Sequence, residues 1–265
     1  MPIAERYADP DLRLEVDSPV IAAQLAHRSV RQFLDTPVDD ATLHAVVAAA
    51  QSASTSSNLQ PWSVIAVRDP ERKARLAALA NHQQFINQAP LLLVWVADLD
   101  RAHRLAASAA AELTGADYLE STIVGVVDTA LAAQNAVVAA ESLGLGTVFV
   151  GAIRNQPRAV ATELALPPHT FATFGLAVGT PDPQERSGIK PRLPQRAVLH
   201  RETYDATHAD GVIADYDDRL AGYNERYGLP GNWSERVLAR LANASSLNGR
   251  DRLRADLEYL GLPSV

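Results

Sequence analysis

The chain has 265 residues, of which 47% are apolar, 24 are Lys or Arg and 31 are Asp or Glu, and it contains no cysteine. Its length and apolar content allow a large buried core, and its formal net charge of -7 argues against general binding of nucleic acid or anionic membranes, which requires a basic face. The lack of cysteine excludes disulfides, iron–sulfur ligation and thiolate zinc sites, and fits a reducing compartment.

The first 17 residues are polar and carry acidic side chains, so they are interpreted as an N-terminal extension and not as a secretory signal. The longest apolar stretches of the chain are interrupted by Asp, Gln, Asn or Glu, and we expect none of them to span a bilayer. These features predict a cytoplasmic protein without membrane or nucleic-acid partners.

Two basic clusters stand out in this acidic chain. The first is His27-Arg28-Ser29-Val30-Arg31, and the second is Lys190-Pro191-Arg192. Arginine offers a planar fork of donors that suits phosphate oxygens, and lysine offers a mobile point charge. The clusters are therefore two halves of a clamp for a small phosphorylated ligand, or two solvated surface patches, or arginines paired with carboxylates such as Asp35 and Glu185.

The segment 39–97 predicts two helices and two strands. Residues 39–53 have apolar side chains at helical spacing behind an acidic start, and the hydroxyl-rich loop 54–58 leads into an alternating run at 62–67 that is typical of a strand. A second helix is expected from Asp69 to about Leu79. The run 90–97 is apolar on both faces, which favours a central strand.

The longest periodic segment runs from about 118 to 143 and is apolar around most of its girth, which predicts a core helix in which Gln134 and Asn135 are satisfied amides. Buried strands are expected at 146–151 and 171–179.

A helix is expected at 155–166, between the two buried strands. Residues 180–200 then predict an extended, irregular crossing, and 209–260 predicts helices broken at 227–232. No G-x-G-x-x-G fingerprint, Walker loop or H-E-x-x-H motif is present, so Rossmann binding and zinc-protease chemistry are excluded and no metal site is expected.

Hydrogen-bond donors gather at element boundaries in four segments, 27–31, 54–58, 83–84 and 190–192, and Gly151 lies at a strand end where backbone can approach a flat ligand. Donors that converge from loops build cofactor pockets. A ligand with a phosphate, a polyol chain and a polar heteroaromatic ring would use cations, hydroxyl groups and amides in turn. Flavin mononucleotide (FMN) has these three parts.

Several motifs resemble those of a known family. They are H-R-S-V-R-Q-F at 27–33, the Ser/Thr run followed by Leu59-Gln60, G-V-V-D-T-A-L-A-A-Q-N-A at 125–136, A-A-E-S-L-G-L-G-T-V-F-V-G at 139–151, F-G-L-A-V-G at 174–179 and K-P-R-L-P at 190–194. Over roughly residues 18–225 the chain is similar to the nitroreductase superfamily, in its group A branch of oxygen-insensitive NADPH nitroreductases and flavin reductases.

This resemblance implies an α+β fold in which a mixed, mainly antiparallel sheet is flanked by helices. It implies a single FMN-binding domain over residues 1–265, with residues 180–265 forming an irregular crossing and C-terminal helices. It also implies a homodimer with an extended C-terminal region and FMN sites at the subunit interface.

The resemblance also assigns candidate FMN contacts by position. The segment His27, Arg28, Ser29, Val30 and Arg31 would contact the phosphate and ribityl end or the mouth of the site. Thr55 and Ser57 would extend this set of contacts. Gln83 would address the polar edge of the ring, and the backbone of Phe149, Val150, Gly151 and Ala152 would face the isoalloxazine. Lys190, Pro191 and Arg192 would lie near the N1/O2 side or the phosphate, and which cation serves which end stays open.

The implied activity is a ping-pong transfer of electrons from NADPH or NADH, through FMN N5, to nitroaromatics, quinones or free flavin. No side chain is assigned as catalytic, because the flavin carries the chemistry. The alternative is a flavin-binding storage, sensing or regulatory protein that oxidises nicotinamides inefficiently.

Three features depart from the family pattern. In well-known members of the family the region that matches 226–233 carries a basic loop for NADPH. Here it holds one basic residue, Arg226, so the choice between NADPH and NADH stays open. Ala152 stands where a second glycine is usual. Residues 105–121 are longer than in a typical member, and form a lid, a dimer contact or an idle insertion.

Overall fold

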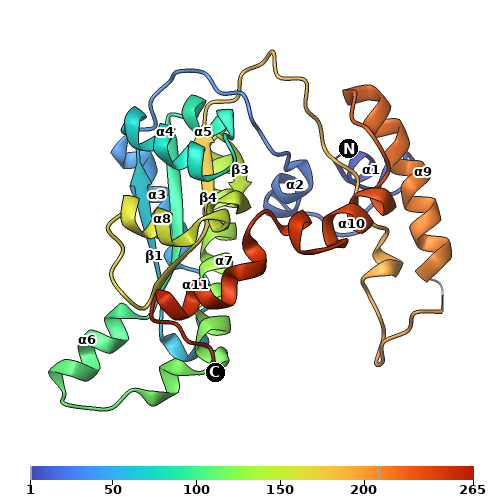
Figure 1. Cartoon of the computed structure of the whole chain (residues 1–265). Helices are drawn as coiled ribbons and strands as arrows, with labels where there is room; N and C mark the ends of the chain where they lie inside the picture. The colour runs from blue at the N-terminus through green and yellow to red at the C-terminus, as the bar shows by residue number, and fades with distance from the viewer. Residues whose placement is uncertain (1, 208) are drawn as a thin grey trace. The chain divides into compact units, whose positions relative to one another are not determined.

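The computed structural model describes residues 2–207 and 209–265, and most of their helices and strands are labelled in Figure 1. The chain divides into two compact units. Unit 1 comprises the residues up to Arg28 together with 186–247, and unit 2 comprises 29–185 together with 248–265. The single domain expected over residues 1–265 stays a prediction.

Unit 2 is built on a four-stranded sheet in the order β1-β2-β4-β3, with each neighbouring pair antiparallel. The strands are β1 (Trp62–Val67), β2 (Leu91–Asp98), β3 (Gly146–Val150) and β4 (Thr170–Gly179). They match the four expected strands to within one residue at each end. The mixed character expected of the sheet is represented by one isolated parallel bridge, between Ser29 and Thr147.

Helices cover both faces of the sheet. One face is covered by α3 (Asp40–Gln51) and α7 (Leu119–Ser142), and the other by α4 (Pro70–Leu79), α5 (Gln84–Gln88) and α8 (Pro157–Glu163). The strand period of two sends Leu93 and Trp95 of β2 to the first face, and Leu92 and Val94 to the second. The central strand is therefore apolar on both sides, as its sequence indicated.

The long helix α7 confirms the helix expected at 118–143 and belongs to the core as expected, but only one of its faces is buried. Its buried face consists mainly of small residues: Thr122, Gly125, Asp128, Thr129, Ala132, Ala133, Ala136, Val137 and Ala140. The larger side chains of Leu119, Ile123, Val127 and Leu131 are between 45% and 49% exposed. The reason is close approach to the sheet, because a Cβ on Gly125 would lie 3.3 Å from the Cβ of Ala97.

The two amides of α7 differ. Asn135 donates from Nδ2 to the carbonyl of Ala49 at 3.2 Å and is a satisfied amide as expected, whereas Gln134 is exposed. By length and composition alone, the helix is also apolar enough to cross a membrane. Because it packs on α3 and the sheet, these properties are those of a core helix.

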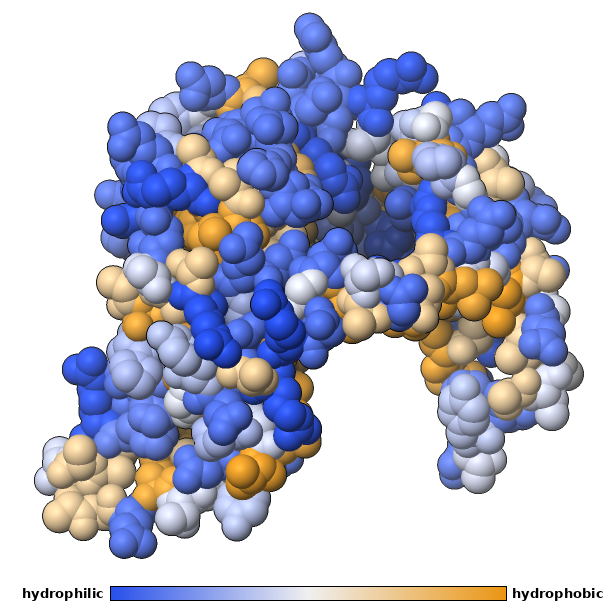
Figure 2. Space-filling model, in the orientation of Figure 1, coloured by the Kyte–Doolittle hydropathy of each residue, from blue (hydrophilic) through white to orange (hydrophobic). Residues whose placement is uncertain are grey.

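After β2 the chain enters α6 (Asp100–Ser108), and a short turn η2 (Thr114–Asp117) then leads into α7. Helix α6 projects from the end of the sheet in Figure 1, and Figure 2 shows pale hydrophobic atoms over its far end and the alanine-rich segment 106–111 that begins there. The C-terminal part of unit 2 holds η6 (Arg250–Arg252) and α11 (Leu253–Tyr259), followed by Leu260 and Leu262, which share a buried cluster with β4 and α8.

Unit 1 is helical. Its elements are α1 (Pro2–Tyr7), α2 (Pro19–Ala26), η4 (Gln195–Ala197), α9 (Ala209–Tyr227), α10 (Trp233–Leu241) and η5 (Ala244–Leu247). The irregular crossing and the helical break near 227–232 are confirmed. Helix α10 begins with a capping box, in which Asn232 and Glu235 each accept the backbone N–H of the other.

Candidate functional site

In unit 1 a further arginine, Arg6, joins the start of the first basic cluster, at His27, to the second cluster, at Lys190. Arg6 of α1 is 6% exposed and donates from Nη1 to the carbonyl of Lys190 at 2.9 Å and from Nη2 to the carbonyl of Leu25 at 3.0 Å. It also donates to the carbonyl of His27. A buried guanidinium with several neutral acceptors is held in one orientation, so the segments ending at His27 and beginning at Lys190 are fixed together.

Helix α9 supports the second cluster from another side. The hydroxyl of Tyr216 donates to the carbonyl of Pro191 at 2.8 Å, and burial raises the pKa of this tyrosine, so it remains a hydrogen-bond donor. The backbone N–H of Arg192 donates to the carbonyl of Arg6 at 2.8 Å. The ammonium of Lys190 lies 5.6 Å from the ring centre of Tyr223.

Arg28 and Arg226 also belong to unit 1. Arg28 donates from Nη1 to the hydroxyl of Ser187, which precedes the Lys190 cluster. The carbonyl of Arg226, at the end of α9, accepts a long bond of 3.5 Å from Arg186. Arg186 therefore lies near the lone arginine of the 226–233 region, a second cation that the spacing of the sequence did not reveal.

In unit 2 the segment after Arg28 runs beside β3. The N–H of Val30 donates to the carbonyl of Thr147 at 2.9 Å, and its side chain is 2% exposed. A Cβ on Gly146 would lie only 2.6 Å from Cγ2 of Val30, so this close approach requires glycine. The N–H of Arg31 donates to Glu185 at 2.7 Å. The Val30 side chain thus belongs to the core, and Glu185 meets the backbone of Arg31.

The hydroxyl-rich loop is anchored to α7 by a buried carboxylate. Asp128 is 3% exposed, and it accepts the hydroxyl of Thr55 at 2.5 Å and the N–H of Ser56 at 3.2 Å. The Thr55 hydroxyl in turn accepts the N–H of Gln60 at 2.9 Å. Ser57 has a left-handed backbone with φ of 50°, a conformation that non-glycine residues adopt at a cost of about 1 kcal/mol or more.

At the end of β3 the chain turns into η3 (Gly151–Asn155). Phe149 is 40% exposed and meets Phe174 edge to face, whereas Val150 is buried. A Cβ on Gly151 would have the guanidinium nitrogens of Arg154 and Arg250 at 3.5 and 3.9 Å as its nearest neighbours. Backbone at Gly151 is therefore accessible and has cationic donors beside it.

Ala152 and Gln83 lie on the same side of the sheet. Ala152 packs partly buried against the core beneath η3. Gln83 is half-buried and precedes α5, after the left-handed residues Asn81 and His82. Its carbonyl accepts the N–H of Ile86, which starts the helix.

The residues of the candidate site fit the chemistry of FMN within each unit. Unit 1 brings together cations from 27–28 and 190–192, which suit an anionic phosphate. Unit 2 offers hydroxyl groups on the 55–60 loop, accessible backbone at Gly151, and the flanking guanidiniums of Arg154 and Arg250. Over residues 2–207 and 209–265, no group of three or more His, Asp or Glu side chains is arranged to hold a metal ion.

Comparison with known proteins identifies the family. The model of the nitroreductase family matches residues 25–180, and that of the nitroreductase family C-terminal domain matches residues 190–264. The chain belongs to the nitroreductase family.

Two relatives illustrate the branch. The Bacillus subtilis protein called FMN reductase (NADPH) is 40% identical over 227 residues, which cover 81% of this chain and 88% of that protein. The oxygen-insensitive NADPH nitroreductase of Salmonella typhimurium is 41% identical over 206 residues, covering 78% and 82% of the two chains.

Solved structures of this family have the same fold. NfrA2 of B. megaterium superposes with a TM-score of 0.87 at 41% identity, covering 93% of this chain and 98% of that one. The NADPH:FMN oxidoreductase from Vibrio harveyi, complexed with NAD+, superposes with a TM-score of 0.83 at 33% identity, covering 94% and 100%. The α+β nitroreductase fold expected from the sequence motifs is confirmed.

Four residues at or behind the candidate site residues of the two units escaped the sequence analysis. They are Arg6, Asp128, Arg154 and Arg250. Asp128 had a recognisable signal, since it is an acidic residue within the apolar repeat of α7. The other three are arginines among 24 basic residues, and only tertiary contacts distinguish them.

Proposed function

We propose that this protein is an FMN-dependent oxidoreductase that uses NADPH or NADH to reduce small electron-poor acceptors such as nitroaromatics, quinones or free flavin. The relatives named above as an FMN reductase and a nitroreductase support this activity. The observation that supports the proposal is the joining of two cationic segments by Arg6, because cations from both segments suit an anionic phosphate.

We assign the candidate residues to the parts of FMN by their chemistry. His27, Arg28, Arg31 and one cation of the Lys190 cluster would neutralise the phosphate, with Ser29, Thr55 and Ser57 along the ribityl chain. The backbone from Phe149 to Ala152 and the amide of Gln83 would face the ring.

When bound, FMN supplies the two-electron chemistry that lets a reduced nicotinamide and an oxidised acceptor react in turn at one site. The cations near N1/O2 would stabilise negative charge there without changing position, a preorganised electrostatic contribution. No side chain of the protein needs to act as a nucleophile, and no metal is required.

A direct experiment separates this activity from the alternative of a flavin storage, sensing or regulatory protein, which the names of the relatives do not favour. Purified protein titrated with FMN should bind it, and anaerobic addition of NADPH or NADH should bleach the flavin absorbance within seconds. Binding of FMN without bleaching by either nucleotide would favour the alternative, and failure to bind FMN would refute both.

We further propose that the protein is a cytoplasmic homodimer without nucleic-acid or membrane partners. The exposed stripe of Leu119, Ile123, Val127 and Leu131 on α7 supports a protein interface, because monomeric proteins rarely expose extended apolar patches. The lack of cysteine and the net charge of -7 support the location and the absence of nucleic acid.

A further inference from the structure

The backbone of the loop 55–60 is strained, because three of its residues have left-handed conformations. Ser57, Asn58 and Gln60 have φ values of 50°, 56° and 50°, although none of them is glycine. Conformations of this kind persist only where the surroundings hold them, and they concentrate at functional sites. The contacts at the two ends of this loop therefore determine whether Thr55 and Ser57 are presented correctly.

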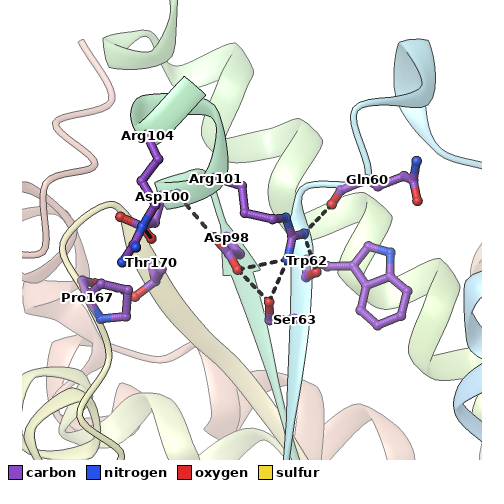
Figure 3. Close-up of polar contacts among 9 residues, drawn as sticks. All are labelled: Gln60, Trp62, Ser63, Asp98, Asp100, Arg101, Arg104, Pro167 and Thr170. Atoms are coloured by element: carbon purple, nitrogen blue, oxygen red, sulfur yellow. Dashed lines mark hydrogen bonds and ion pairs between the residues drawn. The ribbon is translucent and has the colours of Figure 1, made fainter. Parts of the chain in front are cut away.

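The start of the loop is held by Asp128, as described above, and its end is held by Arg101 of α6. Figure 3 shows the Arg101 guanidinium pointing at the backbone that leads from the loop into β1. Its Nη2 donates to the carbonyls of Gln60 at 2.6 Å and Trp62 at 2.7 Å, and its Nη1 donates to the hydroxyl of Ser63 at 3.0 Å. The Arg101 side chain thus holds three acceptors within residues 60–63, the first of which belongs to the left-handed Gln60.

Arg101 is itself oriented by the end of β2. Asp98 accepts from Arg101 at 3.3 Å and from the hydroxyl of Ser63 at 2.5 Å. The other carboxylate oxygen of Asp98 accepts the N–H of Asp100 at 3.1 Å, where α6 begins. The Asp98 carboxylate therefore positions both the start of α6 and the Arg101 guanidinium, and this guanidinium in turn holds the loop 55–60.

A surface ion pair does not account for this arrangement. The ion pair of Arg104 and Asp100, by contrast, joins two side chains of the same helix. Arg101 instead donates three hydrogen bonds to neutral acceptors of another segment, which lies 38 to 41 residues earlier in the chain. A planar fork is needed to reach them together, which a lysine ammonium cannot provide.

We propose that Arg101 is a positioning residue for FMN binding, which acts by holding the 55–60 loop in the conformation that presents Thr55 and Ser57. This inference rests on the proposed function. It gives α6 a role in the proposed site. The sequence of α6 did not indicate this role, and α6 lies outside the four segments in which donors gather.

The test is FMN titration of the full-length apo-protein, with flavin fluorescence as the signal. Arg101→Met should raise the Kd for FMN by about tenfold, and Arg101→Lys by about fivefold, since charge remains but the fork is lost. Arg104→Met, on the same helix with its own ion pair, is the matched control and should bind FMN like the wild type.

Hydrogen exchange separates positioning from general stability. In the wild type, FMN should slow amide exchange both in residues 55–63 and in the first turn of α6, whereas in Arg101→Lys the protection of α6 should be lost while the core strands β2 and β4 exchange as before. If Arg101→Met does not fold, Arg101→Lys carries both measurements.

The outcomes distinguish this inference from the proposed function. A wild-type protein that does not bind FMN would overturn both. A wild-type protein that binds FMN, together with an Arg101→Lys variant of unchanged Kd and unchanged α6 protection, would overturn the role of Arg101 alone.

Discussion

Arg6 decides the shape of the cationic surface in unit 1. Its guanidinium contacts the carbonyls of Leu25, His27 and Lys190, which belong to two segments separated by more than 150 residues in the sequence. Because these acceptors are backbone atoms, the neighbouring side chains of Arg28 and Arg192 remain positioned by the chain itself. In the proposed site, the arginines that would bind the phosphate therefore differ from Arg6, which holds the two segments together.

The assignment of Arg28 gives a prediction at this scale. Arg28→Ala should weaken FMN binding by about 1.5–3 kcal/mol, or roughly tenfold or more in Kd, because a phosphate loses a charge-assisted partner. Equilibrium titration with FMN measures the change. Arg13→Ala is the control, since Arg13 is exposed and donates to the nearby carbonyls of Pro10 and Leu12. Equal loss in both variants would contradict the assignment.

The choice of nicotinamide belongs to the same scale. If Arg226 reads the 2′-phosphate of NADPH, Arg226→Ala should lower kcat/KM for NADPH by about tenfold and leave that for NADH within about twofold. Steady-state rates with both nucleotides measure the ratio. Since Arg186 lies beside the Arg226 carbonyl, an unchanged ratio in Arg226→Ala would be followed by the same measurement on Arg186→Ala.

Among the elements, α7 shows how packing selects side-chain size. Its buried alanines allow the helix to lie close to β2, while its larger aliphatic residues face outward. Ala133→Leu should therefore lower the free energy of unfolding by about 1–3 kcal/mol through overpacking. Ala74→Leu, at an exposed position of α4, should change it by less than about 0.5 kcal/mol. Denaturant unfolding compares the two, and equal effects would contradict this account of α7.

Helix α6 is joined to the rest of unit 2 by two stacked imidazoles. The rings of His103 and His169 are 3.5 Å apart, and Nδ1 of His169 lies 2.7 Å from the carbonyl of Gly261. Burial and then the neighbouring His169 lower the pKa of His103 from 6.5, although Asp117 and Asp100 oppose the shift. The unfolded chain therefore binds more protons than the folded protein below about pH 6.5.

It follows that stability from this pair is present above about pH 6.5 and is lost as the pH falls. His103→Phe keeps a stacked ring without a titrating group, so the free energy of unfolding should depend less on pH between about 7 and 5 than in the wild type. The exposed His44 of α3 provides the control variant His44→Phe. A pH profile of unfolding that His103→Phe leaves unaltered would rule out this role.

For the whole molecule, the stripe on α7 predicts the state of assembly. A two-fold dimer would bury the same apolar face of both copies. Val127→Asp combined with Leu131→Asp should shift the protein from dimer to monomer in sedimentation velocity, because two unpaired charges would enter the interface. Leu143→Asp, at an exposed leucine just beyond the helix, is the control. A wild-type monomer would contradict the proposed dimer outright.

The sequence alone determined the helices and strands with strong local signals. The strands at 62–67, 146–151 and 171–179 lie where alternation and apolar runs predicted them, because strand formation here follows side-chain pattern over a few residues. The family motifs at 27–33 and 139–151 likewise sufficed for the nitroreductase family, since they are continuous in the chain.

The tertiary structure decided what depends on distant contacts. It determined the strand order β1-β2-β4-β3, which face of α7 is buried, and the anchoring roles of Arg6, Arg101 and Asp128. An arginine's helical position says nothing about which carbonyls it will meet, because those acceptors come from segments that only the folded chain brings within 3 Å. Local pattern specifies elements, whereas hydrogen bonds between elements specify the site.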